Sequence, residues 1–104
     1  MKITLHYVLV TLIMHVFTFS NTLAQDSDSA TFKSVCAACH TIGGGKLIGP
    51  DLVNVQDRHT EEWIVKFVKS SQSVIKAGDK YADSIYKAYN QVLMPDHPNL
   101  TDAQ

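Results

Sequence analysis

The sequence is poor in the residues that support the commoner kinds of site in a small protein. Only two cysteines occur in its 104 residues, Cys36 and Cys39, so no second pair exists to complete a four-ligand zinc site. Lys and Arg number 9 against 10 for Asp and Glu, a balance that offers no cationic surface to a nucleic acid. No segment alternates apolar and polar residues as a half-buried strand does. The pattern that remains predicts an all-α fold.

The N-terminal residues differ in composition from the rest of the chain. Lys2 is followed by a mostly apolar run, 3–19, that contains no Asp, Glu or Arg, and acidic, polar residues begin directly after Ala24. This arrangement is typical of an export signal. We predict a signal peptide over 1–24, cleaved after Ala24, and one domain over 25–104 that works in the periplasm or on the outer side of the cytoplasmic membrane. The alternative is an uncleaved helical anchor, which would hold the domain at the membrane.

A domain over 25–104 is small enough that one apolar core contributes only a few kcal/mol, so some additional link is expected. A disulfide between Cys36 and Cys39 would close a very short loop and would remove little entropy from the unfolded chain. A buried, covalently attached macrocycle would supply far more apolar contact area. The size of the domain therefore favours a prosthetic group.

Apolar residues at three- and four-residue spacing predict three helices in this domain. We expect the first to be capped by Asp28 or Ser29, the second to begin after Thr60, and the third to open at Asp79 and end near Asn90. Their apolar positions are Phe32, Val35 and Cys36; Trp63, Ile64, Phe67 and Val68; and Tyr81, Ile85, Ala88 and Tyr89.

Two segments are predicted to be irregular. The stretch 41–52 is rich in glycine and also contains a proline, which leaves little regular structure available to it. After the third helix, Pro95 and Pro98 forbid a continuous helix. Met94 is therefore expected to lie in a loop.

Cys36, Cys39 and His40 carry the strongest chemical signal, because Cys-x-x-Cys-His is the attachment signature of c-type haem. Two thiols at this spacing can each form a thioether to one vinyl group of the porphyrin, while the adjacent imidazole ligates the iron from the same side. We predict one covalent haem c. The alternatives are a plain disulfide or a redox dithiol, although a dithiol opens a helix in a βαβ setting that this sequence does not have.

The second axial position of the iron has several candidates. Met94 is the only methionine outside the predicted signal segment, and we favour it over a role in core packing because it lies beside a proline in a loop. Coordination by His and Met raises the reduction potential. His97, three residues further on, is the rival and would give a lower potential. His59 is interpreted as a surface residue, and the position could also be open.

Together these motifs resemble the class I cytochromes c of the bacterial monohaem kind. The resemblance covers 31–102 and depends on the order and spacing of three motifs, which are Cys36 to Thr41, Gly49 to Leu52, and Met94-Pro95. It implies a small helical domain wrapped around one covalent haem.

The resemblance also implies roles for two further residues. The backbone carbonyl of Pro50 is expected to accept a hydrogen bond from the imidazole of His40, and Trp63 is expected to line the haem pocket. The implied function is that of a single-electron carrier, not an enzyme, with redox proteins such as a reductase and an oxidase as partners. The alternatives are a haem subunit of an enzyme or gas sensor with an open sixth position, and a thiol-disulfide oxidoreductase.

One feature departs from the family. Its members close the fold with a C-terminal helix that crosses the first one, whereas this sequence reaches Gln104 just as that helix should begin at Thr101. Either the product is truncated or a partner supplies the missing packing. Because the apolar side of Phe32 and Val35 would then be uncovered, we predict weak stability as a monomer.

Overall fold

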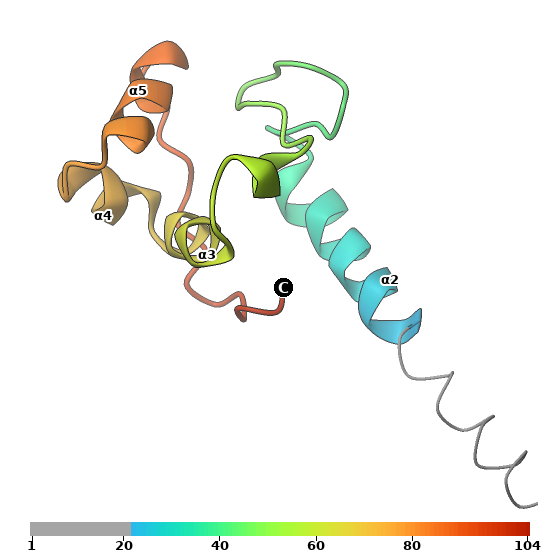
Figure 1. Cartoon of the computed structure of the whole chain (residues 1–104). Coiled ribbons are helices and arrows are strands. Elements are labelled where there is room, and N and C mark those ends of the chain that lie inside the picture. The colour runs from blue at the N-terminus through green and yellow to red at the C-terminus, as the bar shows by residue number, and fades with distance from the viewer. Residues whose placement is uncertain (1–21) are drawn as a thin grey trace, which may run out of the picture.

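The computed structural model describes residues 22–104, and no strand occurs among them (Figure 1). The prediction of an all-α fold is confirmed. The elements, in chain order, are helix α2 (Thr22–Thr31), π-helix η1 (Phe32–Cys36), 3₁₀-helix η2 (Val55–Asp57), and helices α3 (Glu61–Lys69), α4 (Ser71–Lys76) and α5 (Lys80–Ala88). Within this part of the chain, no helix has both the length and the apolar character needed to cross a membrane. The predicted signal segment lies almost wholly outside the described residues and stays a prediction.

The first helix is already regular at Thr22, so the prediction of a cap at Asp28 or Ser29 was wrong. Near its end, the hydroxyl of Thr31 donates to a carbonyl of the helix itself, Ser27 O at 2.9 Å, a bond that accommodates a polar residue in a solvent-exposed helix. At Phe32 the helix widens into the π-turn η1, with Ala37 N–H donating to Phe32 O at 3.0 Å. Such turns concentrate at functional sites, and this one ends at the first cysteine.

Helix α3 begins as predicted. Thr60 is its N-cap, and its hydroxyl accepts a hydrogen bond from Trp63 N–H at 3.2 Å. Glu61 and Glu62 occupy the first turn, where carboxylates interact favourably with the positive end of the helix dipole. The predicted start of this helix is therefore confirmed, and the cap fixes the direction in which its apolar stripe points.

Helices α4 and α5 follow with minimal connections. Only Ser70 separates α3 from α4. The spacing of apolar residues did not predict α4, because the helix has only six residues. Gly78 then adopts a φ of +83°, and Asp79 caps α5 by accepting a hydrogen bond from Ala82 N–H at 2.8 Å. The chain thus turns sharply twice, which packs α4 against both α3 and α5 (Figure 1).

After α5 the chain reverses direction through two left-handed residues, Asn90 (φ 58°) and Gln91 (φ 59°). It then runs without regular structure back past the junction of α3 and α4 (Figure 1), where His97 N–H donates to Val68 O at 3.1 Å. The expectation that Met94 lies in a loop is confirmed.

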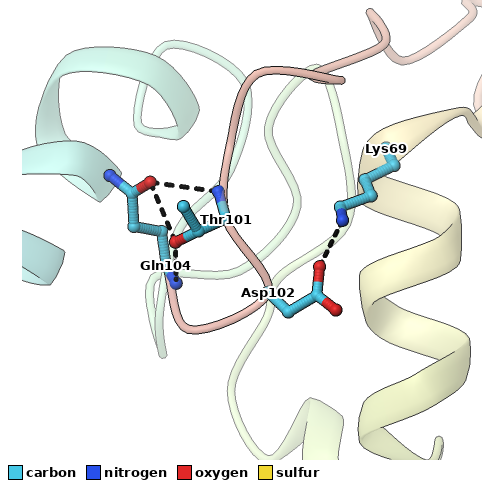
Figure 2. Close-up of polar contacts among 4 residues, drawn as sticks. All are labelled: Lys69, Thr101, Asp102 and Gln104. Carbon is cyan, nitrogen blue, oxygen red and sulfur yellow. Dashed lines mark hydrogen bonds and ion pairs between the residues drawn. The ribbon is translucent and has the colours of Figure 1, made fainter.

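The last residues form a compact turn on α3. Thr101 Oγ1 accepts from Gln104 N–H at 3.3 Å, and Gln104 Oε1 accepts from Thr101 N–H at 3.1 Å (Figure 2). This reciprocal pair is the capping-box geometry of a helix start, as expected for Thr101. Asp102 forms an ion pair with Lys69 of α3, which fastens the turn to that helix.

Few side chains are buried in the described part of the chain. Only Ser71, Val74 and Ala82 are inaccessible to solvent or nearly so. Phe32 is half-buried and Val35 is 39% exposed, and the prediction of weak stability as a monomer stays a prediction. The apolar side chains of α3 and α5 line a shared cavity, and Trp63 and Tyr81 meet edge to face with their ring centroids 5.6 Å apart. The fold is arranged around that cavity.

Replacing Thr60 with Ala tests the cap of α3. Because Trp63 N–H loses its acceptor, we expect the free energy of unfolding of the matured protein to fall by about 1 kcal/mol. Denaturant titration followed by far-ultraviolet circular dichroism measures this change as a lower midpoint at unchanged slope. Thr60→Ser keeps the acceptor and should match the parent; a loss of equal size in both variants would contradict the capping role.

Candidate haem-binding site

The cavity brings together residues that lie far apart in the sequence. It is lined by η1 and the turn after it, by the loop that follows, by α3 and α5, and by the segment after α5. All of the residues predicted for the site border it, namely Cys36, Cys39, His40, Pro50, Trp63 and Met94, and both rival histidines, His59 and His97, do so as well.

The imidazole of His40 is held by the loop opposite its own turn. Its Nδ1 lies 2.8 Å from the carbonyl oxygen of Pro50. A carbonyl can only accept, so Nδ1 carries the proton and the lone pair of Nε2 is left for a metal. The hydrogen bond implied by the family resemblance is therefore present in the structure.

Gly49 allows this close approach. A Cβ at this position would lie 2.5 Å from Cε1 of His40, well inside any real contact distance. Its amide also donates to Cys39 O at 2.7 Å, which ties the loop to the turn that carries the imidazole. A side chain here would push the Pro50 carbonyl away from His40, so the position requires glycine.

The two thiols come from the same turn as the imidazole. The amides of Cys39 and His40 both donate to Cys36 O at 3.0 Å, so one carbonyl organises all three side chains. Burial raises the pKa of the Cys36 thiol. A redox dithiol needs a lowered pKa at its attacking cysteine, so this shift disfavours the thiol-disulfide alternative.

Asp51 braces the glycine-rich loop, a role that the sequence analysis missed. Its carboxylate accepts hydrogen bonds from the amides of Val53 (2.9 Å), Gly43 (2.8 Å) and Gly45 (2.7 Å). These amides, with Val53 contributing most, hold the pKa of Asp51 below its usual value. An Asp beside a Pro in a glycine-rich turn is a recognisable signal for such side-chain bonding to the backbone.

Lys46 extends the same loop across to α5. Its Nζ lies 4.4 Å from the ring centroid of Tyr89 and donates to Ala88 O at 3.5 Å. A cation over an aromatic face and beside the C-terminal carbonyls of a helix is favourable on both counts. The contact connects the glycine-rich loop to the C-terminal end of α5.

His59 does not lie on the surface, so that interpretation was wrong. A hydrogen bond from its own amide to Val55 O, at 3.1 Å, continues the turn of η2 and directs the side chain inward. The ring lies between Trp63, on which it stacks with centroids 4.1 Å apart, and Tyr81, also at 4.1 Å. Its Nε2 is buried and has no hydrogen-bond partner in the described protein.

Trp63 is fixed by the cap of the last helix. Its Nε1–H donates to Asp79 Oδ2 at 3.0 Å, while the other oxygen of Asp79 accepts from Ala82 N–H. Both contacts lower the pKa of Asp79, and the Ala82 amide contributes more. The indole ring therefore has a set orientation against the cavity.

The loop with the candidate distal ligands is fastened at the α3–α4 junction. The buried hydroxyl of Ser71 donates to Met94 O at 2.7 Å, and Ser70 Oγ donates to Asp96 Oδ2 at 3.0 Å. Because Met94 and His97 both line the cavity, the choice between them stays a prediction.

These residues fit a covalently attached haem. One turn offers two thiols and an imidazole with a free Nε2, the walls are mainly apolar, and a thioether lies on a separate segment. The buried Nε2 of His59 would be costly unless a polar group of a ligand meets it. Fold and cavity together define a small helical haem protein.

Comparisons with known proteins agree with this class. The family model described as Cytochrome c matches residues 29–104. The cytochrome c domain of the pp3183 protein from Pseudomonas putida is similar in structure, with a TM-score of 0.59 and 28% sequence identity, over 72% of this chain and 74% of that chain. A search of the curated proteins found no match. The chain belongs to the cytochrome c family, whose members carry covalently bound haem c and transport electrons.

Acid should weaken the loop that Asp51 braces. Its pKa is lower in the folded protein than the ordinary value of about 3.9, so the unfolded chain binds the proton more tightly. The stabilisation is complete above the unfolded pKa and is lost as the pH falls through the folded one. Thermal unfolding of the matured protein between about pH 6 and pH 2.5 should therefore show a smaller acid loss in Asp51→Asn than in the parent.

Asp57→Asn is the control for this comparison, because Asp57 is an exposed carboxylate close by in the same part of the chain. It should leave the parental pH profile unchanged. Equal flattening in both variants would contradict a specific role of Asp51.

Proposed function

We propose that the protein is an exported single-electron carrier with one haem c, attached through Cys36 and Cys39 and ligated by His40 and Met94. The observation that carries the proposal is the convergence of these four side chains on one cavity, with His40 already oriented by the Pro50 carbonyl. The haem, when bound, supplies an iron that changes reversibly between two oxidation states.

The residues of the chain would set the properties of that iron. His40, with its Nδ1 proton on Pro50, presents a fixed and more basic Nε2. The thioether of Met94 favours the reduced state and raises the potential. Trp63, held by Asp79, forms part of an apolar wall that excludes water. Such a site needs little rearrangement between oxidation states.

The cellular setting follows from the sequence. Residues 1–24 have the pattern of an export signal, which supports a periplasmic location or the outer side of the cytoplasmic membrane. A carrier there would accept an electron from a reductase and pass it to an oxidase. A haem that cannot dissociate suits a protein outside the cytoplasm.

Covalent attachment is tested by expression in a host equipped for haem ligation, followed by a denaturing gel stained for haem peroxidase activity. We expect the parent to retain its colour and to resist thiol alkylation, because both sulfurs are engaged in thioethers. Cys36→Ala with Cys39→Ala should lose the stain. A colourless parent with two alkylatable thiols would refute the proposal in favour of the dithiol.

Replacing Met94 with Leu tests the distal ligand. We expect the oxidised parent to show the near-infrared charge-transfer band of a thioether bound to iron and to bind carbon monoxide poorly when reduced. Met94→Leu should lose the band and bind carbon monoxide readily, whereas His97→Ala should keep the parental spectrum. Ready binding by the parent itself would favour the enzyme or sensor alternative.

A further inference from the structure

The loop after α5 presents two side chains able to ligate iron, Met94 and His97, and both line the cavity. We propose that Ser71 is a positioning residue that selects Met94 over His97 as the distal ligand. This inference rests on the proposed haem site and concerns which of two competing residues occupies it.

Ser71 is unusual among the polar residues that the structure describes. It is the first residue of α4 and is 0% exposed, and only two apolar residues, Val74 and Ala82, are comparably buried. A buried hydroxyl must find a partner, and this one donates to Met94 O at 2.7 Å. The bond is short and its donor is inaccessible to solvent, so it fixes the backbone of Met94.

The anchor near His97 is of a different kind. His97 N–H donates to Val68 O at 3.1 Å, a bond between two backbone groups that no side-chain replacement removes. Ser70 adds a contact to Asp96 on the same side of the loop. The position of the Met94 backbone thus depends on the side chain of Ser71, while the position of the His97 backbone does not.

This difference between the two anchors explains how Ser71 would select Met94 over His97 as the ligand. Without the Ser71 hydroxyl, the carbonyl of Met94 loses its buried donor and the Met94 backbone can shift, whereas His97 stays tied to α3 beside the cavity. In the exchange, the bond from iron to the Met94 thioether sulfur would break, and the unprotonated nitrogen of the neutral His97 imidazole would bind in its place. One neutral donor replaces another, so no proton is released and the oxidation state of the iron does not change.

The test compares matured Ser71→Ala with Ser73→Ala at pH 7. Ser73 lies in the same short helix, but it is exposed and its hydroxyl bonds only to Ser70 in the described structure. For Ser71→Ala we expect a weaker near-infrared thioether band and, in its place, the low-spin electron paramagnetic resonance signal of two imidazole ligands. For Ser73→Ala we expect the parental spectra.

A second measurement isolates the hold on Met94. In a His97→Ala background, added imidazole must displace the thioether, so its affinity reports how firmly Met94 is bound. Loss of a buried hydrogen bond should raise that affinity about tenfold in Ser71→Ala, and Ser73→Ala should leave it unchanged. Should Ser71→Ala fail to mature, Ser71→Cys, whose thiol is a weak donor, should show the same change at smaller size.

The outcomes separate the inference from the function on which it rests. Parental spectra and parental imidazole affinity in Ser71→Ala would overturn the role of Ser71 while leaving Met94 as ligand. An open iron site in Ser71→Ala, with His97 present but not bound, would overturn the selection between the two residues. A parent without the thioether band would instead refute ligation by Met94 itself, and the selection with it.

Discussion

The hydrogen bond from His40 Nδ1 to the Pro50 carbonyl is the interaction on which the rest of the site depends. It selects the tautomer of the neutral ring in which Nδ1 carries the proton and Nε2 offers its lone pair, and it is possible only because Gly49 has no side chain to collide with the ring. The carboxylate of Asp51 then holds the surrounding loop through three backbone amides. Three successive residues of one short loop, Gly49, Pro50 and Asp51, therefore serve a single imidazole.

The segment that carries Met94 and His97 is held in a different way. No single loop residue holds Met94 there; the junction of α3 and α4 does, through Ser70 and Ser71 and the backbone of Val68. Ser71, the buried first residue of the short helix α4, anchors an irregular segment through the Met94 carbonyl. The His40 side of the cavity is thus braced within one loop, and the Met94 side is braced by the junction of two helices.

The sequence predicted the parts of the structure that depend on local chemistry. Thr60 and the Cys36 to His40 motif were informative because capping and haem attachment need fixed residues at fixed spacing. Helix α4 and the inward turn of His59 were missed because they depend on packing between distant segments. The π-turn at Phe32 has no composition of its own, so no sequence pattern reveals it.

The scarcity of buried side chains has a consequence for how the protein is made. Beyond Ser71, Val74 and Ala82, the described chain has almost no interior of its own, since its apolar residues converge on the cavity. We expect a polypeptide of this design to gain cooperative structure only as a prosthetic group is joined to it. Chains that miss attachment would stay loosely packed and open to proteolysis, so degradation alone could clear the defective molecules from the population.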